Sequence, residues 1–195
     1  MNEALAALLH VLDELGIKYF AVGSVASSIH GLPRYTQDVD LVVKLGQEHV
    51  ERIYSLTSRE FYMDRDEAQR AVGLGRAFNL IHLASASKFD IFPMSQSEFH
   101  RSEMSRSSEE DWVVPGEGGE GSIRLPVASA EDTILSKLIW YKQGGQVSDR
   151  QWSDILGVAT GAERDWDYMR AWAPRLGVGD LLERVFGEAG QIDLL

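Results

Sequence analysis

The chain has 195 residues, which allows one domain, or one domain plus a modest helical extension, and its composition of 44% apolar and 25% charged residues is typical of a globular protein. Its 30 acidic and 19 basic residues give a net charge of -11, which disfavours duplex DNA as a partner because duplex binding depends on neutralising phosphates with Lys and Arg. No apolar run approaches the roughly 20 residues that span a bilayer, and the absence of cysteine excludes disulfides and thiolate metal sites. With no basic stretch before the first apolar residues, these features predict a cytoplasmic protein without a membrane partner.

Alternating helices and strands are predicted for the first half of the chain. Leucines recur at helical spacing near the N-terminus, and glycine or proline follows several of the predicted elements as a stop signal. The predicted order is a helix at 2–15, a strand at 17–22, a short helix from Gly23 to Gly31, a strand at 36–44, helices at 47–61 and 66–74, and a hairpin of strands at 78–83 and 88–92.

The second half is predicted to begin irregularly and to end in helices. Residues 95–111 are polar and predict a helix followed by a loop. The glycine-rich run 116–121 contains two glutamates and does not precede a helix, which favours a hairpin tip over a phosphate-binding loop. From Ala130 the pattern is helical, with breaks at 144–145, 161, 174 and 177. We therefore predict a core at 1–128 and a C-terminal helical region at 129–195 that packs on it.

Three carboxylates lie beside apolar strand residues. Asp38 and Asp40 are two positions apart, so on a strand their side chains project from the same face. Asp90 is flanked by alternating apolar residues within 88–92. Neighbouring acids repel each other, and carboxylates on rigid strands suit Mg²⁺ or Mn²⁺, whose shell is completed by water and substrate phosphates. The pattern predicts a metal site for phosphoryl transfer.

Other uses of paired acids fit the sequence less well. In haloacid-dehalogenase-like phosphatases the pair ends an apolar strand, whereas here polar residues 34–37 precede the acids and apolar residues 41–43 follow them. A calcium-binding loop would need further acids and a glycine at the place of Val43. Solvated surface acids are the remaining alternative, although carboxylates beside buried strand residues are costly unless they have a partner.

The turn at Gly23-Ser24 comes before the paired acids. Glycine lets a backbone approach phosphate closely at a helix N-terminus, and the serine hydroxyl can donate a hydrogen bond. By itself this is equally typical of an ordinary strand-to-helix connection. Its position upstream of the acids favours phosphate contact.

The order of these motifs resembles the nucleotidyltransferase fold of the DNA polymerase beta superfamily. The resemblance rests on Gly23-Ser24, then Thr36-Gln37-Asp38-Val39-Asp40-Leu41, then Phe89-Asp90-Ile91. Within the superfamily, the chain resembles small bacterial nucleotidyltransferases, including the abortive-infection toxin type. The resemblance covers roughly residues 17 to 155, and two further segments also look like that group, namely 131–138 and 148–155. It implies an α+β fold with a mixed sheet backed by helices and followed by a helical part.

The resemblance also implies a reaction and a set of site residues. In the two-metal scheme, an NMP moves from an NTP to an acceptor hydroxyl and pyrophosphate leaves. Asp38 and Asp40 would bind both metals, and Asp90 would complete the catalytic one and help to deprotonate the attacking hydroxyl. The implied nucleotide-binding residues are Gly23, Ser24, Arg34 and Lys137.

Some of these residues have alternative interpretations. Arg34 either meets phosphate or pairs with a local acid. Lys137 lies among apolar residues of its predicted helix and reaches either solvent or triphosphate, and the resemblance favours triphosphate. Asp154 follows Arg150 by one helical turn, which predicts an intrahelical ion pair.

The acceptor and the physiological role are not predicted by the sequence. An RNA end such as that of tRNA, a protein side chain and a small molecule, as in antibiotic nucleotidylation, are all candidate acceptors. The alternative function is a toxin–antitoxin or regulatory nucleotide-binding module with little turnover, for which an antitoxin is a candidate partner.

Overall fold

The computed structural model describes residues 1–36, 38–113, 121–161 and 164–192. The chain forms two compact units, one from Met1–Val25 and Tyr35–Val127, the other from Ala26–Arg34 and Ala128–Leu195. A short segment near the N-terminus therefore belongs with the C-terminal helices. The division into folding domains at residue 128 stays a prediction.

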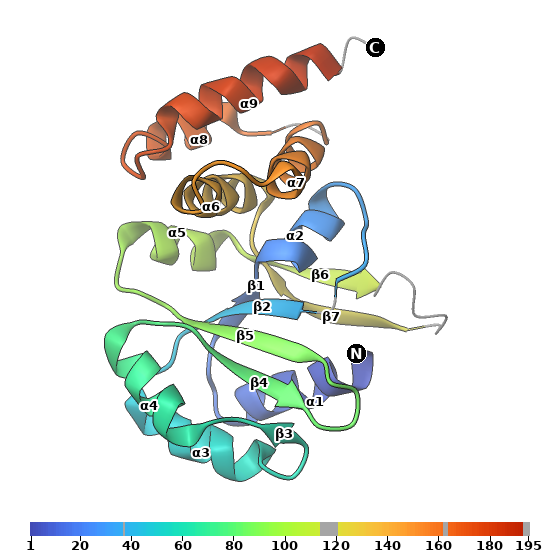
Figure 1. Cartoon of the computed structure of the whole chain (residues 1–195), viewed down its shortest axis with the longest axis vertical. Coiled ribbons are helices and arrows are strands. Elements are labelled where there is room, and N and C mark those ends of the chain that lie inside the picture. Colours follow the sequence, from blue (N-terminus) through green and yellow to red (C-terminus); the bar gives the residue numbers. More distant parts are fainter. Residues whose placement is uncertain (37, 114–120, 162–163, 193–195) are drawn as a thin grey trace. The chain divides into compact units, whose positions relative to one another are not determined.

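In the described part of the first unit, seven strands form one mixed sheet (Figure 1). The strands are β1 (Tyr19–Ala21), β2 (Asp38–Val43), β3 (Phe61–Tyr62), β4 (Phe78–His82), β5 (Lys88–Pro93), β6 (Ser108–Val113) and β7 (Ser122–Val127). Their order across the sheet is β3-β4-β5-β2-β1-β7-β6. The β2–β5 and β1–β7 pairs are parallel, and the other neighbours are antiparallel. This arrangement confirms the predicted α+β class and the mixed sheet.

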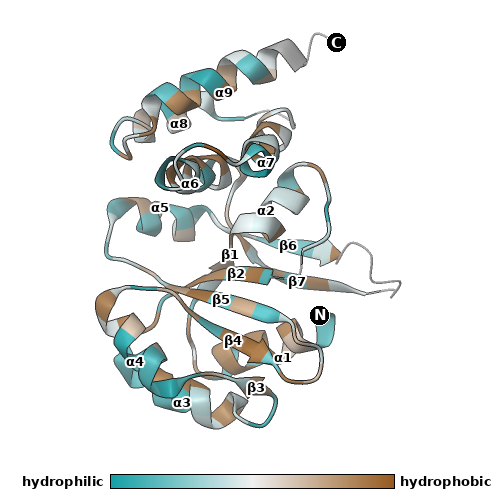
Figure 2. Ribbon diagram, viewed as in Figure 1, coloured by the Kyte–Doolittle hydropathy of each residue, from teal (hydrophilic) through white to brown (hydrophobic). Residues whose placement is uncertain are grey.

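Helices cover one face of this sheet and close the core of the first unit. The helices of the unit are α1 (Asn2–Glu14), α3 (Gln47–Thr57), α4 (Arg65–Leu74) and α5 (Glu98–Arg106), and α1, α3 and α4 lie together on one side in Figure 1. Alternate residues of β2 and β5, such as Leu41 and Phe89, are fully buried, and Figure 2 shows much of these strands as apolar and α3 and α4 as largely hydrophilic. Burial of these side chains supplies the main driving force for this unit.

The second unit is a cluster of helices. Helix α2 (Gly23–His30) starts in the first unit and contributes its later residues here, where it is joined by α6 (Ala130–Gln143), α7 (Asp149–Ala159), α8 (Trp166–Trp172) and α9 (Gly179–Ile192). Apolar residues such as Leu138 and Val185 are fully buried among them. Two hydrogen bonds join the segment 26–34 to the rest of this unit. One links the ring of His30 to the carbonyl of Ala128, and in the other Arg164 donates to the carbonyl of His30.

Two predicted boundaries were wrong. The helix expected to reach residue 61 ends at Thr57, and Phe61–Tyr62 instead form β3, because pairing with β4 satisfies their backbone groups. The loop expected before residue 111 is the strand β6, whose register with β7 extends from Ser108 to Val113. Most of the glycine-rich run lies at 114–120, outside the described residues. Among the helices that the structure describes, none is long and apolar enough to cross a membrane.

Candidate functional site

Asp38, Asp40 and Asp90 lie on the neighbouring strands β2 and β5. The parallel register sets Asp40 opposite Asp90 and Asp38 opposite Lys88. Opposed residues of paired strands project from the same face of a sheet, and the residues between them, such as Val39, project to the other, buried face. The pairing of β2 with β5 therefore brings three carboxylates and one ammonium group to a single face.

The Asp90 carboxylate pairs with a neighbouring lysine. Within the described ranges, no group of three or more His, Cys, Asp or Glu side chains is arranged to hold a metal ion. Instead, Oδ2 of Asp90 lies 2.9 Å from Nζ of Lys88. The hydrogen bond to Asp90 raises the pKa of Lys88, and the charges of Asp38 and Asp40 add to this effect. The oxygen donors and their register suit Mg²⁺, but the cation that Asp90 holds here is the Lys88 ammonium.

The glycine at the start of α2 makes room for Asp40. Gly23 has φ +60°, in the left-handed region, and a Cβ at this position would collide with Oδ2 of Asp40 and lie 2.9 Å from its Cγ. The amide of Val22 donates to the carbonyl of Asp40 at 3.0 Å, which fixes the end of β1 beside the acid. Ser24 follows as a half-buried residue in the first turn of α2, where backbone N–H groups favour anions. A side chain at position 23 would thus displace the Asp40 carboxylate, whatever the glycine does with phosphate.

Replacing Gly23 with alanine should therefore destabilise the protein by more than the positive φ at this position would cost alone, because the new Cβ also meets Asp40. Gly75→Ala is the matched control, because Gly75 also has a positive φ, +64°, but a Cβ there would meet no other atom within 4 Å. We expect about 1 kcal/mol of destabilisation for Gly75→Ala and at least about 1 kcal/mol more for Gly23→Ala, measured by urea unfolding. Equal losses in the two variants would show that the contact between Gly23 and Asp40 is unimportant.

Arg34 and Lys137 meet on a single carboxylate in the second unit. Asp154 accepts hydrogen bonds from Nε and Nη2 of Arg34 at 2.9 and 2.8 Å, and from Nζ of Lys137 at 2.9 Å. The side chains of Lys137 and Asp154 are only 6% and 10% exposed, so this lysine does not extend into solvent. The predicted pair between Asp154 and Arg150 is wrong. Nothing in the local sequence indicates the observed pair with Arg34, which spans 120 positions.

Asp154 is an ionised carboxylate held between two cations. Burial favours the neutral form of Asp154, but the hydrogen bonds and charges of Arg34 and Lys137 outweigh it, so the pKa of Asp154 is lowered and the group is ionised. The bidentate geometry with Arg34 is the strong form of such a pair. Two cations thus contact the one carboxylate of Asp154.

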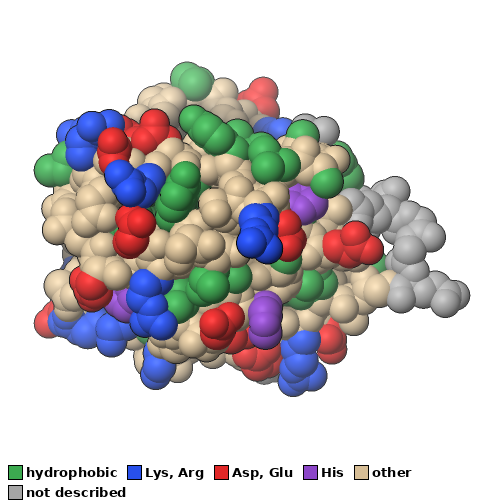
Figure 3. Space-filling model, turned by 90° about the horizontal axis from the view of Figure 1, so that it is seen from below, with side chains coloured by type: hydrophobic (Ala, Val, Ile, Leu, Met, Phe, Trp, Pro, Cys, Tyr) green, Lys and Arg blue, Asp and Glu red, His purple; other side chains and the backbone are tan. Residues whose placement is uncertain are grey.

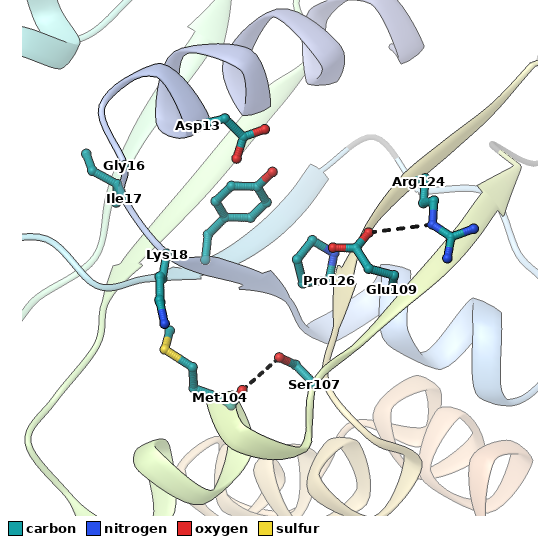
Figure 4. A pocket seen from close by; sticks show the side chains of 10 residues that line it. Asp13, Gly16, Ile17, Lys18, Met104, Ser107, Glu109, Arg124 and Pro126 are labelled. Atoms are coloured by element: carbon teal, nitrogen blue, oxygen red, sulfur yellow. Dashed lines mark hydrogen bonds and ion pairs between the residues drawn. The ribbon is translucent and has the colours of Figure 1, made fainter.

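A separate cavity of about 580 Å³ opens at the start of β1 (Figure 4). Tyr19, which lines it, pairs with Val43, whereas the acids lie beside the opposite end of β1. Burial, together with the carboxylate of Asp13, raises the pKa of Tyr19, so the phenol is neutral. Figure 4 shows Glu109 and Arg124 paired across two strands, at 3.9 Å. The cavity contains none of the residues expected to bind nucleotide.

The surface over α3 and α4 mixes charges of both signs. Figure 3 shows Lys and Arg side chains interspersed with Asp and Glu on this face. Arg70 lies 2.8 Å from Glu67, and Arg65 lies 3.5 Å from Glu51. Such local pairing does not create the extended positive field that duplex nucleic acids require.

Comparison with known proteins identifies the fold. No protein-family model matches the chain, and no curated protein sequence does. The solution structure of the antibiotic-resistance factor ANT(2'')-Ia is similar, with a TM-score of 0.52 and 14% identity over 92% of this chain and 95% of that chain. The crystal structure of ANT(2'')-Ia in complex with adenylyl-2''-tobramycin gives a TM-score of 0.51 and 15% identity over 89% and 97% of the two chains.

At these identities the likeness is one of fold. The chain has a nucleotidyltransferase fold, which confirms the fold predicted from the order of its motifs. The resemblance to the toxin type stays a prediction.

Proposed function

We propose that the protein is a metal-dependent nucleotidyltransferase, which moves an NMP from an NTP to an acceptor hydroxyl and releases pyrophosphate. The main support is the register of β2 and β5, which sets Asp40 opposite Asp90 on the face that also carries Asp38. The fold adds to this support, because it is shared with ANT(2'')-Ia, a protein solved with a compound that carries an adenylyl group.

In the proposed reaction, the acceptor oxygen forms a bond to the α-phosphorus, and the bond from that phosphorus to the oxygen of the leaving pyrophosphate breaks. Asp38, Asp40 and Asp90 would hold Mg²⁺ or Mn²⁺, which neutralises phosphate charge and stabilises the attacking and leaving oxygens when bound. We assign to Asp90 the further role of accepting the hydroxyl proton, since a carboxylate beside the acceptor can act as a general base.

Four residues are proposed to bind the triphosphate. Gly23 and Ser24 begin α2, whose N-terminal N–H groups and partial positive charge suit phosphate oxygens. Arg34 and Lys137 both contact Asp154, which holds the two cations in defined positions. Ordered cations lose less entropy on binding than freely rotating ones, which favours affinity.

A second candidate function is a regulatory or toxin–antitoxin module that binds nucleotide with little turnover. The observation that favours it is the ion pair of Lys88 with Asp90, which engages one of the three acids that catalysis would use. The acceptor in the first proposal remains an RNA end, a protein or a small molecule. Both proposals require NTP binding, and only the first requires transfer.

Incubation with labelled nucleotides separates the two candidates. The protein is mixed with cell extract and each NTP, labelled in parallel at the α- or the γ-phosphate, with Mg²⁺ or Mn²⁺ and with EDTA as control. We expect the α-label to appear on an acceptor in the presence of metal, and the γ-label to leave as pyrophosphate. Binding of NTP without transfer to any acceptor, including the protein itself, would support the regulatory module and overturn the enzyme. Transfer of the γ-label would indicate a different reaction.

A further inference from the structure

Lys88 shares one face of the sheet with the three acids. It stands two positions before Asp90 on β5, so both side chains project the same way, and it pairs in register with Asp38 on β2. We call these four residues the β2–β5 charge patch; its members are Asp38, Asp40, Lys88 and Asp90. Because Lys88 and Asp90 are two positions apart, the sequence alone places the lysine on the same face of the strand as the acid.

The patch contains three negative charges and one positive charge. The Lys88 ammonium lies 2.9 Å from Oδ2 of Asp90, and the two side chains are 37% and 22% exposed. This ion pair directs the Asp90 carboxylate to the lysine. In the part of the chain described by the structure, no group of three or more His, Cys, Asp or Glu side chains is arranged so that it could hold a metal ion. A divalent ion that takes Oδ2 of Asp90 as its ligand would have to displace the ammonium group.

We propose that Lys88 is the resident counter-ion of this patch and competes with the divalent metal for Asp90. The inference rests on the proposed function, in which the three acids hold that metal. Lys88 neutralises part of the repulsion between the acids in the metal-free protein, and it weakens metal binding because its positive charge repels the metal and it occupies Oδ2 of Asp90. It is a positioning residue, which acts on the metal through Asp90.

Removing the charge of Lys88 should change metal affinity and metal-free stability in opposite directions. Lys88→Met retains most of the length of the side chain without its charge and should bind metal roughly fivefold more tightly, because a competing cation is lost from a partly exposed site. In EDTA the same variant should unfold at a lower temperature than the wild type, since the three carboxylates lose their counter-ion. Saturation with Mn²⁺ should remove this difference.

The test uses the full chain and Mn²⁺ alone as the probe, titrated by isothermal calorimetry and followed by thermal unfolding with and without EDTA. Lys88→Arg retains the charge and should bind Mn²⁺ like the wild type. Lys44→Met is the matched control, because Lys44 is exposed at the other end of β2 and the variant loses the same charge. Tighter Mn²⁺ binding in Lys88→Met and not in Lys44→Met supports the proposal.

Asp90→Asn separates failure of this inference from failure of the proposed function. In one outcome, the wild type binds Mn²⁺ and Asp90→Asn weakens that binding, but Lys88→Met binds Mn²⁺ no more tightly than the wild type. Lys88 then does not compete, and only the present inference is overturned. If neither the wild type nor Lys88→Met binds Mn²⁺, the metal site itself is overturned. Should Lys88→Met fail to fold, Lys88→Gln provides the same comparison with a polar side chain.

Discussion

Asp40→Asn is expected to weaken Mg²⁺-dependent NTP binding on the order of 100-fold or more, since loss of a residue that only supports a metal ligand already costs about 10- to 100-fold. Asp40 is the central acid of the patch. It shares a strand with Asp38, stands opposite Asp90, and lies against Gly23 at the start of α2. Asparagine keeps the shape of the side chain but removes its charge and one of its acceptor oxygens. Because the variant binds NTP so weakly, it should also no longer transfer the α-label to an acceptor.

The binding loss is measured by calorimetric titration of the four NTPs with Mg²⁺ present, and circular dichroism verifies that the variant is folded. Asp111→Asn is the control on the same sheet. Asp111 is exposed on β6, and its pair with Arg124 is long, at 3.9 Å, so its loss should leave NTP binding unchanged. Wild-type NTP affinity in folded Asp40→Asn would refute the proposed site.

Asp154→Ala is expected to lower the free energy of unfolding by about 3 kcal/mol, which is typical when one partner of a buried ion pair is removed. The reason is the environment of Lys137, whose side chain is only 6% exposed and would lose the carboxylate that it contacts at 2.9 Å. Arg34, at 24% exposure, reaches solvent more readily. Urea unfolding measures the loss.

Two comparisons identify the cause of that loss. Asp149→Ala removes an exposed acid from the first turn of the same helix and should cost less than about 1 kcal/mol. The double variant Asp154→Ala/Lys137→Met should be more stable than Asp154→Ala, because it also removes the buried ammonium group. A double variant less stable than Asp154→Ala would contradict the explanation by an unpaired charge.

The pH dependence of the same variant provides a further comparison. The pKa of Asp154 is lowered in the folded protein, so its contribution to stability is present at neutral pH. That contribution begins to be lost as the pH falls through the ordinary pKa of aspartate, about 3.9, and is gone below the pKa in the folded state. The difference in unfolding free energy between wild type and Asp154→Ala should therefore shrink in acid.

The site illustrates which contacts local patterns predict. The spacing of Asp38 and Asp40 placed both on one face of a strand, because side chains alternate along any strand whatever it pairs with. The alternation of side chains along β2 could not predict which strand pairs with it. Helices α3 and α4 and the strands β3 and β4 separate β2 from β5 in the chain, and the parallel register that sets Asp40 opposite Asp90 arises only when all of them pack.

The sequence by itself determined the periodic elements, the strand that begins with two acids, the stops of the C-terminal helices and the resemblance to a nucleotidyltransferase fold. These features depend on residues close together in the chain, where backbone geometry decides the direction of each side chain. The tertiary structure alone decided that Asp154 holds Arg34 and Lys137, and that the Asp40 carboxylate occupies the space left by Gly23. Such contacts join distant segments, and their partners are selected by the packing and charge balance of the folded chain.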